Sequence, residues 1–256
     1  PLYSSAASDV YKRQGGNLRT FIVGAAAIDP NIIESFYKIG FKALQGYGLT
    51  ECSPLVAGNN DFFYKADSVG LPIPNVEYKI NNPDDQGVGE IIAKGPNVML
   101  GYYNDPEATD NVFKKGWFYT GDLGYIDDDG FLYITGRCKS VIVTQNGKNI
   151  YPEEIEYYLN ASPLVKECIV LGVNYKGDKE TYVNAKLLPD IEAFKEYLNK
   201  DDISDTDIKK EFKKLISEVN KKLPNYKHIK DFKVVENEFE KTTTQKIKRF
   251  GNNLSM

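Results

Sequence analysis

The sequence predicts a mixed fold with an α/β portion, a small β-barrel subdomain and a C-terminal α+β domain. Residues 15–66 alternate between strand-like and helix-like apolar patterns, whereas residues 67–136 hold short strand-like runs separated by polar turns. The charge changes near Lys139, from 12 basic and 17 acidic side chains in residues 1–140 to 20 and 19 in residues 141–256. The change predicts a domain boundary at this point. The expected domains are residues 15–138 and 139–256.

Residues 1–14 are small and polar and show no sustained period of 2 or 3.6. We interpret them as a non-native leader, the alternative being a disordered native terminus, and exclude them from the fold.

The first structured segment is predicted to be α/β. Asp29 is a good N-cap and Pro30 a good first helical residue, while Gly40 is a typical helix stop. A glycine-containing turn at Gly46 and Gly48 is expected after the second strand. The expected elements are a strand over 18–23, a helix from Pro30 to Gly40 and a strand over 41–44.

The barrel subdomain is predicted from its strands and turns. Its turn clusters contain Asn-Asn-Pro-Asp-Asp and Asp-Asp-Asp-Gly, which favour tight reversals between short strands. The expected strands are 76–80, 90–93, 124–126 and 131–135.

The C-terminal domain begins with a hairpin signal, Asn146-Gly147, between apolar runs. Pro152 then opens a helix whose first turns are rich in glutamate, as the helix dipole favours. The remaining expected elements are strands over 168–173, 182–188 and 232–235 and a charged amphipathic helix over about 205–222.

Composition excludes several classes of protein. The formal net charge is −4, from 32 basic and 36 acidic residues, which argues against a general nucleic-acid binder. Three widely spaced cysteines form neither a disulfide framework nor a zinc site, and the single histidine excludes a two-histidine metal site. No apolar run approaches the length of a membrane span, and no secretory signal is present. We therefore expect a cytoplasmic protein.

The segment QGYGLTE, residues 45–51, follows a predicted strand and is the first candidate site. Glycines such as Gly46 and Gly48 permit close approach of the backbone to a ligand, and Tyr47 offers a flat ring. Thr50 supplies a hydroxyl, and Glu51 supplies a carboxylate suited to Mg²⁺. An ordinary strand-to-loop turn is the alternative interpretation.

Three further segments contain candidate polar groups. In GWFYTGDLG, Asp122 on a tight turn can accept hydrogen bonds from a diol such as ribose, although a barrel corner would look similar. Arg137 and Lys139 bring cations to the expected domain joint, where solvated surface charges are the alternative. Lys246, in the basic tail KTTTQKIKR, can stabilise developing phosphate charge, or simply belong to a solvated end.

Taken in order, these segments resemble the AMP-forming adenylating superfamily, which includes acyl-CoA synthetases, adenylation domains and firefly-type luciferases. The resemblance covers about residues 18–249. VMLGYYNDPEAT and GKNIYPEEIE are most similar to bacterial long-chain fatty-acid–CoA ligases. The resemblance to the superfamily rests on QGYGLTE, GEIIAKGPNVMLGYYNDPEAT, GWFYTGDLG, GRCKSVIV, NGKNIYPEEIE and KTTTQKIK.

The resemblance implies the end of a large α/β domain, a mobile hinge and a small C-terminal domain. It implies an enzyme that uses ATP, Mg²⁺ and CoA to convert a carboxylic acid into acyl-AMP and then acyl-CoA. The ligases that the sequence resembles most favour a fatty acid as that substrate. The resemblance leaves the oligomeric state and peripheral membrane contact open.

The resemblance also assigns roles to individual residues. Thr50, Glu51 and Lys246 would act in catalysis, with Glu51 holding the metal ion. Lys139 would lie at the hinge, and Gly147 would let the pantetheine of CoA pass. The nucleotide would be bound by Gly24, Ala25, Ala26, Gly46, Tyr47, Gly48, Asp122 and Arg137.

The sequence departs from the family pattern at Glu240 and Gln245, where proline and glycine are usual, and at Gly24-Ala25-Ala26, where a Gly-Gly pair is usual. The loop that wraps the β- and γ-phosphates has no counterpart in these 256 residues, so we expect the chain to be the C-terminal part of a ligase and poorly active alone. The alternatives are an enzyme that charges a carrier protein or an aryl acid, and a non-catalytic nucleotide-binding module.

Overall fold

The computed structural model describes residues 17–24, 28–175, 180–242 and 247–249. The chain divides into two compact units, Pro1–Thr135 and Gly136–Met256, and each is described by itself. The predicted leader (residues 1–14) lies outside the described residues. So do three predicted site residues: Ala25, Ala26 and Lys246.

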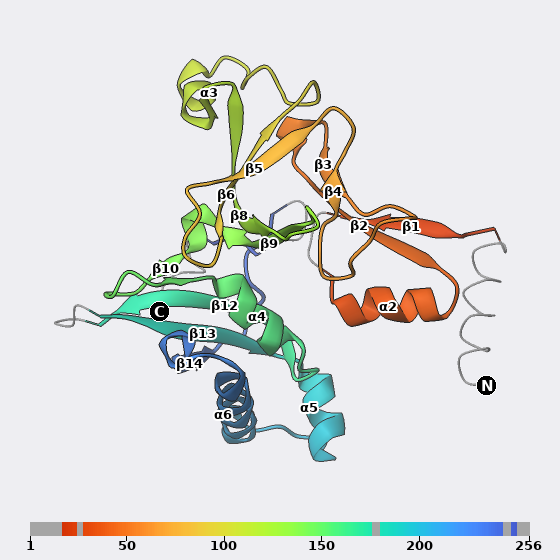
Figure 1. The fold of residues 1–256 in the computed structure, drawn as a ribbon. Coiled ribbons are helices and arrows are strands. Elements are labelled where there is room, and N and C mark those ends of the chain that lie inside the picture. The colour runs from red at the N-terminus through yellow and green to blue at the C-terminus, as the bar shows by residue number, and fades with distance from the viewer. Residues whose placement is uncertain (1–16, 25–27, 176–179, 243–246, 250–256) are drawn as a thin grey trace. The chain divides into compact units, whose positions relative to one another are not determined.

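The first unit begins with a four-stranded sheet in the order β1-β2-β3-β4 (Figure 1). Strands β1 and β2 are parallel, and the other neighbours are antiparallel. Helix α2 lies against β1 and β2, where Phe36 packs edge-on against Phe21 with ring centroids 4.8 Å apart. The elements are β1 (Thr20–Val23), α2 (Pro30–Lys38), β2 (Lys42–Gly48), the 3-10 turn η1 (Thr50–Cys52), β3 (Leu55–Gly58) and β4 (Leu71–Pro72).

Helix α2 confirms the predicted start and stop. The Asp29 side chain accepts a hydrogen bond from the Asn31 amide at 2.8 Å, Pro30 is the first helical residue, and Gly40 has a φ of +87°. The turn expected at Gly46 and Gly48 is wrong, because both residues belong to β2, which pairs with β3 on one side. These glycines allow close strand contact within the sheet.

The second sheet of this unit is a curled half-barrel of five strands. Its order is β5-β6-β8-β7, and the long strand β8 also pairs with β9 (Figure 1). The elements are β5 (Glu77–Asn81), β6 (Gly89–Lys94), α3 (Pro106–Val112), β7 (Phe113–Lys114), β8 (Trp117–Ile126) and β9 (Leu132–Arg137).

One hydrophobic core joins both sheets of the first unit. Tyr47 and Val56 enter it from the first sheet, and Ile91, Phe118 and Leu132 enter it from the second. The bonds between Leu132 and the segment at Gly70 also connect β9 to the start of β4. The α/β and β-barrel parts of the prediction are thus confirmed.

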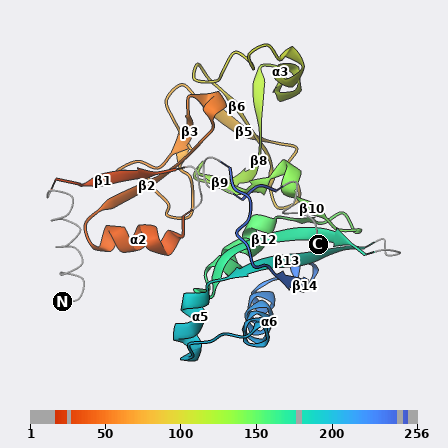
Figure 2. The same ribbon diagram turned by 180° about the vertical axis from the view of Figure 1, so that it is seen from behind.

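The second unit is an α+β domain built on the antiparallel pair β12–β13, with β14 parallel to β13 (Figure 2). Its elements are η2 (Cys138–Ser140), β10 (Ile142–Val143), β11 (Asn149–Ile150), α4 (Pro152–Asn160), β12 (Val165–Asn174), β13 (Thr181–Pro189), α5 (Ile191–Leu198), α6 (Asp205–Lys222), η3 (Asn225–Lys227) and β14 (Ile229–Val234).

Helices α4, α5 and α6 cover the same face of the sheet. Ile155 of α4, Phe194 of α5 and Phe212 of α6 share one buried cluster with Ala185 and Leu187 of β13. The opposite face holds a smaller cluster, in which Phe239 of the tail packs with strand residues. This segregation of helices is the α+β arrangement that the sequence predicts.

No helix within the described parts of the chain is both long and apolar enough to cross a membrane.

Candidate functional site

Two predicted site residues, 75 positions apart in the chain, meet inside the first unit. The Tyr47 hydroxyl of β2 donates a hydrogen bond of 2.7 Å to Oδ2 of Asp122 in β8. Both side chains are buried, with 9% of Tyr47 and 4% of Asp122 exposed. The folding of the two sheets onto one core therefore brings the aromatic and the acidic candidate together.

A β-bulge presents Asp122, whereas the sequence predicted a tight turn there. The pairing of β6 and β8 shifts register between Glu90 and Ile92, and Gly121 within the bulge has a φ of +72°. The Thr120 hydroxyl donates to the Ile91 carbonyl at 2.7 Å and accepts the Asp122 amide at 3.1 Å. The turn prediction is wrong because glycine adopts this backbone as readily in a bulge as in a turn.

The electrostatic environment keeps Tyr47 as a neutral phenol beside the Asp122 carboxylate. Burial raises the pKa of Tyr47 above its ordinary value, and the negative charge of Asp122 raises it further. Tyr47 therefore stays protonated, and its hydroxyl donates a hydrogen bond to the carboxylate. Such charge-assisted bonds are stronger than neutral ones.

Glu51 lies in the short turn η1, directly after β2. Its Oε1 accepts a hydrogen bond of 3.0 Å from the Tyr102 hydroxyl, and its backbone carbonyl accepts the Met99 amide at 2.7 Å. Burial and the Glu51 carboxylate together raise the pKa of Tyr102. Thr50 precedes Glu51 and is exposed. The carboxylate is thus held at one oxygen in a half-buried position.

This arrangement suits a magnesium ion that is bound together with a phosphate-bearing ligand. Within the described ranges, no group of three or more His, Cys, Asp or Glu side chains is placed to hold a metal ion. Mg²⁺ commonly needs only one or two carboxylates, because water and substrate phosphates complete its octahedron. A single carboxylate such as Glu51 fits that requirement.

The glycines of the candidate site have different structural reasons. A Cβ on Gly48 would lie 1.7 Å from the carbonyl oxygen of Pro54, so packing between strands requires glycine there. A Cβ on Gly46 would lie 3.0 Å from the Leu55 side chain. On Gly24 it would meet only the Gly46 carbonyl, at 3.8 Å, among the described residues, which is an ordinary contact.

The other predicted site residues belong to the second unit. Arg137 and Lys139 are exposed at η2. Gly147 has a φ of +73° in the loop between β10 and β11, which confirms the predicted hairpin. The Thr144 amide donates to the Lys148 carbonyl at 3.0 Å and closes this loop.

Sequence reasoning missed three residues that support the site. Tyr102 binds Glu51, Thr120 ties the bulge to β6, and the Glu90 carboxylate accepts the Gly121 amide at 3.1 Å. The sequence signal for the bulge was Thr-Gly-Asp within a strand-like run. The signal for Glu90 was a polar residue on the strand predicted to pair with that run.

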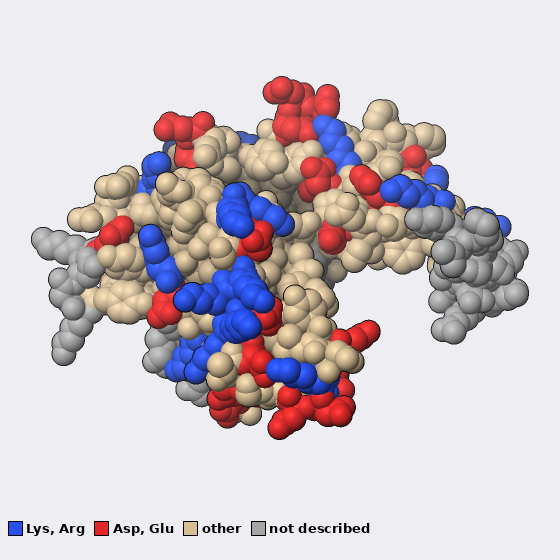
Figure 3. Space-filling model, turned by 90° about the horizontal axis from the view of Figure 1, so that it is seen from below, with Lys and Arg blue, Asp and Glu red and all other residues tan. Residues whose placement is uncertain are grey.

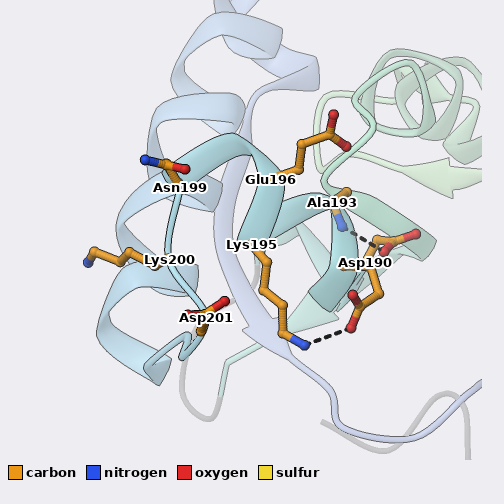
Figure 4. Close-up of a pocket in the computed structure, with 8 residues that line it drawn as sticks. Asp190, Ala193, Lys195, Glu196, Asn199, Lys200 and Asp201 are labelled. Atoms are coloured by element: carbon orange, nitrogen blue, oxygen red, sulfur yellow. Dashed lines mark hydrogen bonds and ion pairs between the residues drawn. The ribbon is translucent and has the colours of Figure 1, made fainter.

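A separate open hollow lies beside α5 in the second unit (Figure 4). Lys195 forms an ion pair of 2.8 Å with Glu192 there, and none of the predicted site residues lines the hollow. Figure 3 shows basic and acidic side chains next to one another.

Comparison with known protein families identifies matches in both units of the chain. The chain matches the AMP-binding enzyme family over residues 3–103 and the AMP-binding enzyme C-terminal domain over residues 139–250.

Two curated relatives are long-chain-fatty-acid–CoA ligases. The Escherichia coli protein is 43% identical over 157 residues, which cover 59% of this chain and 28% of that protein. FadD15 of Mycobacterium bovis is 34% identical over 250 residues, which cover 92% of this chain and 40% of that protein. The chain thus spans less than half the length of these relatives.

A solved structure with a similar fold is the o-succinylbenzoate coenzyme A synthetase MenE of Bacillus subtilis, in complex with ATP and magnesium ion. The TM-score is 0.73 at 29% identity, and the match covers 95% of this chain and 48% of that chain.

Proposed function

Since the chain belongs to the family of AMP-binding enzymes, we propose that it forms the nucleotide-binding and C-terminal part of an ATP-dependent acid–thiol ligase. The ligase would convert a carboxylic acid and ATP into acyl-AMP and pyrophosphate, and then transfer the acyl group to CoA with release of AMP. The observation that carries this proposal is the buried contact between Tyr47 and Asp122, which places an aromatic ring beside a carboxylate.

The first unit would bind the AMP moiety. The Tyr47 ring would stack on adenine, and Asp122 would accept hydrogen bonds from the ribose hydroxyls. Gly24, with Ala25 and Ala26, would line the adenine and acyl side through backbone groups. Gly46 and Gly48 flank Tyr47 in β2.

Thr50, Glu51 and Lys246 would serve the chemistry at the α-phosphate. In the first step a carboxylate oxygen of the acid attacks the α-phosphorus, and pyrophosphate leaves. Thr50 would donate its hydroxyl to the α-phosphate, and Lys246 would stabilise the negative charge shared between carboxylate and phosphate oxygens. A magnesium ion held by Glu51 would neutralise phosphate charge.

The second step would use the C-terminal unit. The CoA thiolate attacks the acyl carbonyl, and AMP leaves with the electron pair of the broken carbon–oxygen bond. Lys139 would lie at the hinge about which the C-terminal domain turns between the first and the second step. Arg137 would lie beside the ribose. Gly147 would let the pantetheine of CoA pass, and a Cβ at this position would meet no atom of the described residues within 4 Å.

A fatty acid is the acyl substrate that the sequence comparison favours, because the curated relatives named above are long-chain-fatty-acid–CoA ligases. An aryl acid is the second candidate, since MenE is named for o-succinylbenzoate and shares the fold. Acylation of a carrier protein, and nucleotide binding without catalysis, are the remaining alternatives.

The proposal is tested in the longest open reading frame that contains this chain, after the coding DNA has been read upstream of Gly15. Formation of acyl-CoA from a fatty acid, o-succinylbenzoate or no acid distinguishes the substrates. We expect Lys246→Ala to abolish acyl-AMP formation while it spares acyl transfer from supplied acyl-AMP to CoA. Lys248→Ala, two residues away, is the matched control and should leave both steps intact.

Three results would contradict parts of this proposal. Equal loss of both steps in Lys246→Ala would remove the assigned role of that lysine. Transfer of the acyl group to a carrier-protein thiol but not to CoA would favour the carrier-charging alternative. Nucleotide binding without turnover on any acid would favour the non-catalytic module.

A further inference from the structure

A single hydroxyl group connects the two side chains that we assign to adenine and ribose. We propose that the Tyr47 hydroxyl is a positioning group for Asp122, and that selectivity for ribonucleotides over deoxyribonucleotides depends on it. The inference rests on the proposed nucleotide site and adds to it a second role for Tyr47, distinct from stacking by its ring.

Asp122 lies where the backbone of the sheet is irregular. Asp122 lies in the bulge of β8, where the regular pairing with β6 is interrupted between Glu90 and Ile92. A bulge redirects a side chain, but it also removes part of the strand ladder that would fix the backbone. The Asp122 amide is held instead by the Thr120 hydroxyl at 3.1 Å.

Tyr47 supplies a rigid anchor for the carboxylate. Its ring packs in the core of the first unit, and its neighbours in that core include Val56 and Phe118. Because only 9% of Tyr47 is exposed, its hydroxyl has a fixed position 2.7 Å from Oδ2 of Asp122. A buried carboxylate requires hydrogen-bond donors, and this bond fixes the direction of the second carboxylate oxygen as well.

The donor role of Tyr47 does not change with pH in the neutral range. Burial and the neighbouring carboxylate raise the pKa of Tyr47, so the phenol keeps its hydrogen. Asp122 is therefore oriented whenever the protein is folded. An oriented carboxylate recognises a diol better than a rotating one, because less rotamer entropy is lost on binding.

The substitution Tyr47→Phe separates the two roles of this residue. It keeps the ring for stacking and removes only the hydroxyl. Tyr78→Phe is the matched control, because the Tyr78 hydroxyl also donates within the first unit, to the Gly130 carbonyl at 2.8 Å, and its ring packs against the same core.

The experiment is calorimetric titration of the chain with AMP, 2′-deoxy-AMP and 3′-deoxy-AMP. The wild-type protein should bind AMP more tightly than either deoxy analogue. Tyr47→Phe should lower the affinity for AMP about tenfold and for the deoxy analogues less than twofold, so that selectivity falls by more than about fivefold. Tyr78→Phe should leave the selectivity unchanged.

The possible failures can be told apart. Equal loss of affinity for all three nucleotides in Tyr47→Phe, or no loss for any, would overturn the inference while AMP binding by the wild type upholds the nucleotide site. No binding of AMP by the wild type would overturn the nucleotide site and, with it, the inference.

A nucleotide-free measurement adds an independent check. In urea unfolding, Tyr47→Phe and Asp122→Ala should be non-additive, because each removes one partner of the same bond. Additive effects would overturn the positioning role whatever the titrations show.

Discussion

Substitution of Gly48 by alanine tests whether this glycine serves packing between strands. The new Cβ would lie 1.7 Å from the Pro54 carbonyl oxygen, 2.6 Å from its carbonyl carbon and 2.8 Å from Cα of Leu55. All three atoms are backbone, so no flexible side chain can move aside. Overpacking of this kind typically costs 1–3 kcal/mol, and a clash with backbone alone places Gly48→Ala at about 3 kcal/mol.

The assay is urea unfolding followed by the fluorescence of the single tryptophan, Trp117, which lies in the same unit. Gly24→Ala is the matched control, because its Cβ would lie 3.8 Å from the Gly46 carbonyl, an ordinary contact. We expect the control to change the free energy of unfolding by less than about 0.5 kcal/mol. Unfolding of Gly48→Ala at the wild-type urea concentration would refute the packing argument.

Three further predictions concern thiols, pH and the second core. Cys138 is exposed while Cys52 and Cys168 are buried, and burial raises the pKa of Cys52 to about 11; a chromogenic disulfide reagent should therefore label one thiol quickly at pH 8. Hydrogen bonds from Lys200 and Ser204 hold the pKa of Asp207 below its ordinary 3.8. The stability that this carboxylate contributes is present above pH 3.8 and is lost as the pH falls through the lower folded-state pKa. The free energy of unfolding of Asp207→Asn should therefore fall less steeply than that of the wild type below about pH 4. Phe212→Ala empties part of the second core, where its ring packs against Phe194 at 5.5 Å, and should cost about 3–5 kcal/mol.

Each of these predictions has a contradicting result. Rapid labelling of two or three thiols in the folded protein would show that the cores open. An unchanged acid transition in Asp207→Asn would remove the pH argument. A cost below about 1 kcal/mol for Phe212→Ala, or a similar cost for alanine at the 61% exposed Tyr197, would contradict the described core.

Helices were predictable because their signals are local. Helix α6 occupies the expected residues, since Ser204 and Asp207 form a capping box and apolar residues recur at helical spacing. Helix α2 was equally clear from Asp29 and Pro30. Helices α3 and α5 were not predicted. They have seven and eight residues, too few for a strong periodic pattern.

Strand lengths were less predictable, because glycine has the same local signature in a turn, a bulge and a close strand pair. Gly46 and Gly48 extend β2, and Gly121 creates the bulge in β8. Only the partner strands decide among these cases, and the carbonyl of Pro54 lies against Gly48 as a result of folding. Non-local packing of this kind leaves no mark in the local sequence.

The site was predictable as a set of residue types but not as a set of contacts. Tyr47, Glu51 and Asp122 were identified from their segments, yet nothing in the sequence indicated that Tyr47 and Asp122 share a hydrogen bond. Tyr102 was missed as a partner of Glu51 for the same reason, since 51 residues separate the two. Their meeting depends on how β2, β8 and the loop before α3 pack together.

The most direct test of the account is calorimetric titration of the chain with AMP, which lacks the β- and γ-phosphates and so does not need the loop that would wrap them. The account predicts saturable binding of one AMP per chain, weakened at least tenfold by Asp122→Ala, because that substitution removes the proposed acceptor for the ribose hydroxyls. The absence of AMP binding, or binding of equal strength in Asp122→Ala, would contradict the central claim that Tyr47 and Asp122 form a nucleotide site.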